Sequence, residues 1–186
     1  RGQSNGSHPY AAGLRWDRQD RVAKGLQTNA FPNALFGLPP AVVLTGGKIK
    51  ETNLSPRVAV TRHWNGDLMT YASVARGARG GGFNPPAVPA NLRTYKGDSA
   101  WTYEIGTKYS SPDRRLSLAV DVFYNDYSDY VGLNSILKTG ASFTTIDLNS
   151  GDVESYGIEL EGSYKITPQW TIAGGGSLMH ARLTNT

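Results

Sequence analysis

Few side chains in this sequence combine in a way that could support catalysis. Glu159 and Glu161 would share one face of a strand, which is the arrangement of a carboxylate pair for acid–base chemistry. Lys165 falls on the same face, and we interpret all three as the lining of a wet surface. The histidines are His8, His63 and His180. None has a carboxylate or cysteine at metal-ligand spacing and no Gly-x-Ser-x-Gly motif is present, so we predict no enzyme, no metal and no cofactor.

The segment from Arg76 to Gly82, Arg-Gly-Ala-Arg-Gly-Gly-Gly, is the clearest candidate for binding. It lacks the Lys-Ser/Thr of a phosphate-binding loop, and one short copy does not make an RNA-binding tract. The formal net charge of +4 is spread along the chain, so we predict no nucleic-acid partner. Two interpretations stay open, a flexible loop base or a cationic contact for an anionic small molecule. The candidate ligand contacts are Arg76, Arg79, Phe83, Asn84 and Tyr130.

The elements that would position these residues are β-strands. Between Trp101 and Ser110 the odd positions are mostly large and apolar and the even positions are mostly polar. After a turn at residues 111–114, the apolar positions from Leu116 to Tyr124 are the even ones. This period of two predicts an antiparallel hairpin with one apolar face, because on a helix the same residues would scatter around the axis.

Similar alternation predicts an all-β chain of about seven strands. The other predicted strands cover residues 11–21, 54–64, 68–76, 155–166 and 170–184. Tight turns at 65–66, 111–114 and 167–169 alternate with long loops at Val22–Asn53, Gly77–Asp98 and Ser128–Asp152, the last with a short strand at about 143–148. All tight turns would lie at one end of the sheet, as in an up-and-down outer-membrane barrel with short periplasmic turns and long extracellular loops.

Aromatic side chains gather near both ends of the predicted strands, on the apolar parity. Those near the tight turns are Trp64, Tyr109, Tyr164 and Trp170, and those near the other end are Trp101, Tyr124 and Tyr156. Eight residues along one strand span roughly 20 Å after a tilt near 40°, close to the ~25 Å apolar band of membrane barrels. The pattern predicts two aromatic girdles with membrane lipid against the apolar face. A soluble sandwich, with a second sheet on that face, is the alternative at this point.

Several strings resemble the barrel of TonB-dependent outer-membrane receptors. Tyr71 to Asn84 is similar to the family's YxxxxRGxxxGGFN, and Tyr103 to Lys108 is similar to its YELGxK strand. Arg114 to Tyr127 resembles RRLxLxxAxFYxDY, and Tyr156 to Glu161 resembles xGxELE. Gly13 to Trp16 resembles an earlier GLRY strand. These strings occur in the family's order along most of the chain.

The resemblance implies a transmembrane β-barrel in the Gram-negative outer membrane. Family barrels have about 22 strands around a plug, so residues 1–186 would form part of one barrel domain, without the plug and the closing strands. The implied function is TonB-coupled uptake of a scarce solute, with a ferric siderophore as the expected ligand and TonB as a partner through the plug segment. A passive outer-membrane channel and a soluble all-β binding module are the alternatives.

Overall fold

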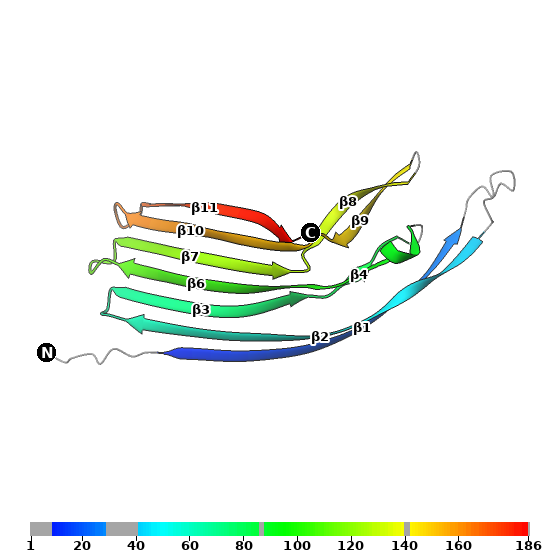
Figure 1. The fold of residues 1–186 in the computed structure, drawn as a ribbon. Helices are drawn as coiled ribbons and strands as arrows, with labels where there is room; N and C mark the ends of the chain where they lie inside the picture. The colour runs from blue at the N-terminus through cyan, green and yellow to red at the C-terminus, as the bar shows by residue number, and fades with distance from the viewer. Residues whose placement is uncertain (1–8, 29–40, 86–87, 140–141, 186) are drawn as a thin grey trace.

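The computed structural model describes residues 9–28, 41–85, 88–139 and 142–185, which are almost entirely β structure. Seven strands form one antiparallel sheet whose spatial order follows the chain, β1-β2-β3-β6-β7-β10-β11 (Figure 1). Their bounds are β1 Tyr10–Thr28, β2 Ala41–His63, β3 Leu68–Arg79, β6 Asp98–Ser110, β7 Leu116–Ser128, β10 Asp152–Lys165 and β11 Thr171–Asn185. The predicted all-β, up-and-down sheet of about seven strands is confirmed.

The sheet is a single curved layer in the described part of the chain (Figure 1). The buried apolar side chains found there are Val88, Val131 and Ile146, and all lie outside the seven strands. Strand residues of the apolar face stay open, with Val58 57% and Tyr103 43% exposed. No second sheet covers this face among the described residues, so the sandwich alternative is wrong for them. No described helix is long and apolar enough to cross a membrane.

Three tight turns close hairpins at one end of the sheet, here called the turn end. In the first, the Asn65 side-chain oxygen accepts hydrogen bonds from the backbone N–H groups of Asp67 and Leu68, both at 2.8 Å. In the second, Arg114 has the left-handed φ of 55° that lets the chain reverse. In the third, the Thr167 hydroxyl accepts from the Trp170 N–H at 3.1 Å. The predicted turns are therefore confirmed, each with its own side-chain or backbone device.

The hairpins are staggered in the way that a closed barrel requires. After the first tight turn, β3 begins at Leu68, which pairs with Tyr109. Tyr109 lies two residues before Ser111, where the second tight turn begins. After the second tight turn, β7 begins at Leu116, which pairs with Tyr164. Tyr164 lies two residues before Ile166, where the third tight turn begins. Each turn is therefore offset by two residues from the next turn along the sheet. Two strands separate successive turns, so the offset is about one residue per strand. Tilted strands around a barrel axis show such a shear.

The opposite end of the sheet, here called the loop end, carries more structure than the sequence predicts. The additional elements are β4 Gly82–Phe83, the 3-10 helix η2 Ala90–Leu92, β5 Thr94–Tyr95, β8 Val131–Thr139 and β9 Ser142–Asn149. Strands β4 and β5 pair with each other, and so do β8 and β9. The short strand predicted at about 143–148 is confirmed within β9. The prediction of a plain loop over Gly77–Asp98 is wrong, since β3 continues to Arg79 and β4, η2 and β5 follow.

The loop predicted over Val22–Asn53 is also wrong at both of its ends. Strand β1 continues to Thr28 and β2 begins at Ala41, and the two remain paired past a bulge between Val22 and Lys24. Residues 29–40 lie outside the described part. Alternation fails here as a signal because the backbone pairing of these segments does not depend on an apolar face.

The sequence pattern does not predict strand β8, for a different reason. Its pairing with β9 shifts register between Gly132 and Ser135, and Asn134 has a φ of 54°. A bulge of this kind interrupts the period of two. The prediction of loop over Ser128–Asp152 is therefore replaced by a β8–β9 hairpin that rises from the loop end (Figure 1).

Candidate functional site

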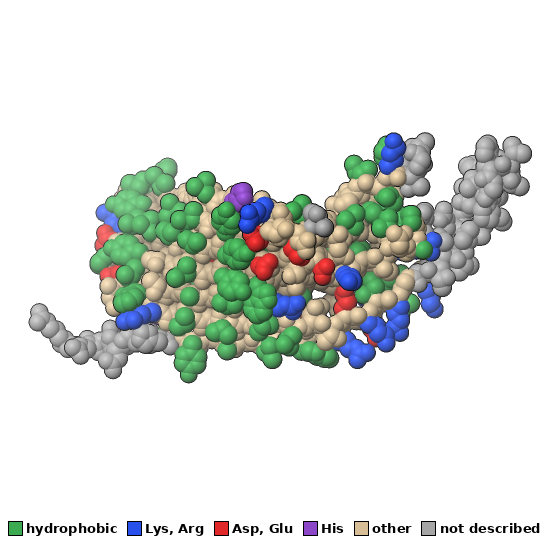
Figure 2. Space-filling view, viewed as in Figure 1, with side chains coloured by type: hydrophobic (Ala, Val, Ile, Leu, Met, Phe, Trp, Pro, Cys, Tyr) green, Lys and Arg blue, Asp and Glu red, His purple; other side chains and the backbone are tan. Residues whose placement is uncertain are grey.

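One face of the sheet carries a continuous apolar surface, here called the outward face. Cross-strand register places Tyr103, Tyr124 and Tyr156 in one row over β6, β7 and β10. The rings of Tyr103 and Tyr124 are 6.1 Å apart, and Trp101 stacks on Tyr103 at 6.4 Å. Hydrophobic side chains cover the part of the molecule near the turns (Figure 2). Trp101, Tyr124 and Tyr156 thus lie together on the predicted face, and their role as a membrane girdle stays a prediction.

The second aromatic group lies beside the tight turns on the same face. The Arg62 guanidinium lies 3.9 Å from the Trp64 ring centroid, and the Arg115 guanidinium lies 5.3 Å from that of Tyr164. Tyr109 pairs with Leu118 in the neighbouring strand. The remaining member of this group is Trp170, which is 70% exposed. Amphipathic rings next to cations are typical of a membrane–water interface.

Charged residues end the apolar surface toward the loop end. Asp126 lies beside Trp101 in the register, and Arg182 pairs with Glu154 at 3.0 Å on the next two strands. Arg76 falls in the same row and donates a hydrogen bond to the Leu54 carbonyl at 2.7 Å. The structure thus places Arg76 on the outward face, on the opposite parity from Arg79.

The other face of the sheet, the inward face, is polar. The Tyr71 hydroxyl donates to the Glu104 carboxylate at 2.5 Å, and the Lys108 ammonium lies 5.7 Å from the Tyr71 ring centroid. Glu159 pairs with Asp121 on the neighbouring strand, so both carboxylates face the same side. No described group of histidine or carboxylate residues could hold a metal ion. Water or polar protein is the natural cover for this face.

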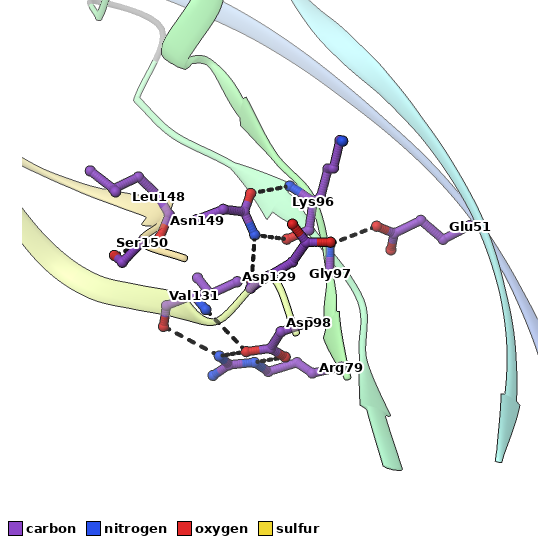
Figure 3. A network of polar contacts seen from close by, with 10 residues as sticks. All are labelled: Glu51, Arg79, Lys96, Gly97, Asp98, Asp129, Val131, Leu148, Asn149 and Ser150. Atoms are coloured by element: carbon purple, nitrogen blue, oxygen red, sulfur yellow. Dashed lines mark hydrogen bonds and ion pairs between the residues drawn. The ribbon is translucent and has the colours of Figure 1, made fainter. Parts of the chain in front are cut away.

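The glycine-rich segment at the loop end is hydrogen-bonded to one carboxylate. Glu51 on β2 accepts a backbone hydrogen bond from Gly81 at 2.8 Å. It accepts another from Gly97, also at 2.8 Å (Figure 3). A Cβ at Gly81 would clash with the Tyr95 carbonyl, and a Cβ at Gly97 would clash with the Arg79 carbonyl. The glycines therefore permit a close approach of two backbone segments. The segment is thus tied to β2 by two hydrogen bonds, and both interpretations of it stay predictions.

Arg79 forms an ion pair with a neighbouring carboxylate, that of Asp98. Its guanidinium binds Asp98 in a bidentate manner, with one nitrogen at 3.0 Å, and also lies 3.4 Å from the Val131 carbonyl (Figure 3). Asp98 is only 9% exposed and also accepts from the Val131 N–H at 3.2 Å. The hydrogen bond to Asp98 raises the pKa of Arg79. Arg79 thus ties β3 and β6 to the start of β8.

Asn84 makes a second tie between separate loop-end segments. Its side-chain amide donates to the carbonyls of Leu92 and Asp147 at 2.7 Å each, and its oxygen accepts from the Asp147 N–H at 2.8 Å. Phe83 precedes it in β4 and pairs with Thr94 in β5. Sequence reasoning identified Asn84 as a ligand contact, whereas the structure gives its polar atoms partners within the protein.

Tyr130 lies in the same region and is 37% exposed. It packs edge-on against Tyr127, with ring centroids 5.9 Å apart. A cavity of about 310 Å³ brings Tyr130 together with Arg79, Asp98 and Leu133. Arg76, Phe83 and Asn84 do not line this cavity. Asp98 and Glu51 were missed as functional residues because a lone carboxylate in a sequence gives no sign of the backbone groups it will meet.

Comparison with known proteins identifies what this arrangement is similar to. The family model described as TonB dependent receptor-like, beta-barrel matches residues 10–185. The pesticin receptor of Yersinia enterocolitica is 23% identical over 146 residues, which cover 75% of this chain and 20% of that protein. The catecholate siderophore receptor Fiu of Escherichia coli K12 is 33% identical over 96 residues, which cover 52% of this chain and 12% of that protein.

A solved structure has the same fold. The ferric yersiniabactin uptake receptor FyuA from Yersinia pestis superimposes with a TM-score of 0.70 at 20% identity, over 95% of this chain and 24% of that chain. The present chain spans about a fifth of the length of the pesticin receptor.

Proposed function

Because the chain belongs to the TonB-dependent receptor β-barrel family, whose members lie in the Gram-negative outer membrane, we propose that the whole protein takes up a ferric-siderophore complex. Energy would come from TonB acting through a plug segment. The observation that carries the proposal is the family match over residues 10–185 together with relatives named as siderophore receptors. No catalytic step is needed, because the solute would be bound and moved unchanged.

The two faces of the sheet suit this role. Lipid would cover the outward face, from the aromatic residues near the turns to the charged row near Asp126. The inward face, with Tyr71, Glu104 and Asp121, would line the barrel interior. A membrane barrel is a single sheet with one apolar and one polar face. In a soluble module, the apolar face of such a sheet would be left exposed to water.

We propose that ligand contact centres on the cavity beside Tyr130. A tyrosine ring that is partly exposed can stack on a flat ligand group at little entropic cost. Arg79 would act by positioning the β8 segment, since its Nε and one of its two terminal nitrogens already donate to Asp98 and to the Val131 carbonyl. Asn84 would hold the β9 segment in the same way, and Phe83 and Arg76 would lie further from the ligand.

The test is growth of a receptor-deficient host that expresses the full-length gene, on media with single ferric siderophores as the iron source. We expect growth on at least one siderophore, and loss of that growth when tonB is deleted. Tyr130→Ala should raise the siderophore concentration needed for half-maximal growth roughly tenfold, with Tyr10→Ala on the outward face as control. Uptake that persists without tonB would instead support a passive channel.

A further inference from the structure

Lysines replace apolar residues on the outward parity of β2 beyond the apolar surface. From the turn end, this parity reads Val60, Val58, Pro56 and Leu54, and then Thr52, Lys50 and Lys48. Both lysine side chains are exposed. Figure 2 shows Lys and Arg gathered on the β1–β2 ribbon, past the region where hydrophobic side chains dominate. The outward parity of β2 thus changes from apolar to cationic toward the loop end.

A cavity separates this part of β2 from the neighbouring segment. Pairing between β2 and β3 stops at Arg57 and Ala75, so the two strands diverge toward the loop end (Figure 1). The resulting cavity has a volume of about 710 Å³. Its lining includes Lys48, Lys50, Thr94, Lys96, Asp129 and Asn149.

The third lysine is held in place by its backbone. The Lys96 N–H donates to the Asn149 side chain at 3.0 Å, and the Asn149 amide donates to the Lys96 carbonyl at 3.1 Å (Figure 3). The same amide donates to the Asp129 carbonyl at 2.7 Å. The position of Lys96 across from β2 is therefore organised before any ligand arrives.

The charge balance of the cavity is positive. Among the described ion pairs, none involves Lys48, Lys50 or Lys96. The Glu51 carboxylate is already used by the N–H groups of Gly81 and Gly97, and Asp129 is the other carboxylate in the lining. Asp20, opposite Lys50 in the register, pairs with Arg18 at 3.8 Å. With three lysines against two carboxylates, the lining keeps a net positive charge, which suits a phosphate ester.

We propose that this lysine cavity binds the headgroup phosphates of a phosphorylated glycolipid in the outer leaflet. The headgroup is favoured over a soluble phosphate because Lys48 and Lys50 continue the outward parity that lipid covers. The inference rests on the membrane placement of the proposed function and is independent of the transported solute.

The test uses the full-length receptor purified in detergent, with native mass spectrometry to measure lipid binding. The probes are lipid A with two phosphates, the same lipid without phosphates, and inorganic phosphate. The variants are K48Q/K50Q/K96Q and a matched control, R57Q/K108Q/K165Q, which removes three positive charges from the inward parity.

We expect the lysine variant to bind phosphorylated lipid A at least roughly tenfold more weakly than the wild type, with the control unchanged. Dephosphorylated lipid should bind weakly and equally to all three proteins. Equal binding of phosphorylated lipid by the wild type and the lysine variant would overturn the proposal. So would inorganic phosphate binding as tightly as the lipid, because the source would then be soluble.

Folding and transport are followed separately. Heat-modifiable gel mobility reports whether each barrel is folded. If the triple variant fails to fold, K50Q alone replaces it in the binding test, and we expect it to lose part of the lipid binding. Siderophore-dependent growth should be retained by the lysine variant. If the wild-type receptor supports no growth on any siderophore, the proposed function is contradicted. The lipid measurement uses purified protein, so its result does not depend on that growth test.

Discussion

At the scale of single residues, two carboxylates organise the loop end. Glu51 binds the backbone of Gly81 and Gly97, and Asp98 binds Arg79 and the Val131 N–H. Both join segments that are far apart in the chain. Glu51 meets backbone donors at Gly81 and Gly97, whereas Asp98 meets the Arg79 guanidinium and the backbone N–H of Val131.

Gly97→Ala should destabilise the loop end by about 1–3 kcal/mol, since the new methyl group would clash with the Arg79 carbonyl. Gly77→Ala is the matched control, because nothing lies within 4 Å of a Cβ there. Amide hydrogen exchange of the full-length receptor checks this prediction. Equal exchange rates near residues 79–98 in both variants would contradict it.

Asp98→Asn should weaken the tie between β6 and β8 by roughly 1–2 kcal/mol, less than a fully buried ion pair because Arg79 is half exposed. Faster hydrogen exchange at Val131 is the expected readout. Glu154→Gln, which breaks the exposed pair with Arg182, should leave that exchange rate unchanged.

At the scale of elements, parity along each strand decides what a substitution costs. On β10, Ile158 and Leu160 face outward beside Val122 and Val120, and Glu159 faces inward beside Asp121. The same strand thus presents hydrocarbon on one side and carboxylates on the other.

Leu160→Arg or Ile158→Arg should cost about 2–4 kcal/mol if these residues lie near the bilayer midplane, because the charge would enter hydrocarbon. Glu159→Gln should cost little. Urea unfolding of the full-length receptor in phospholipid bilayers measures both. Equal tolerance of charge at the two parities would rule out lipid on the outward face.

At the scale of the whole molecule, the sheet has two open edges in the described part of the chain, β1 and β11. Each presents unpaired backbone groups along a long strand. An isolated 186-residue piece should therefore self-associate, even in detergent, because open strand edges bind other edges. Sedimentation velocity checks this, with the full-length receptor as the monodisperse control, and a stable monomeric piece would contradict it.

The sheet could be predicted from the sequence wherever one strand face is apolar. Alternation around Ile105 and Val122, and the turn at Asn65-Gly66, are local signals, so strand order, parity and tight turns follow from them. The extended β1–β2 ribbon and β8 could not be predicted, since the residues of the ribbon show no regular period of two and the register of β8 shifts after Gly132.

The sequence by itself determined that apolar and polar side chains would lie on opposite faces of the sheet, because side-chain direction along a strand has a strict period of two. Only the tertiary structure decided what Arg79, Asn84 and Glu51 do. Their partners, Asp98, Asp147, Gly81 and Gly97, are brought to them by strand pairing across 19 to 63 residues. A hydrogen bond depends on where two groups meet in space, and no spacing along the chain encodes that meeting.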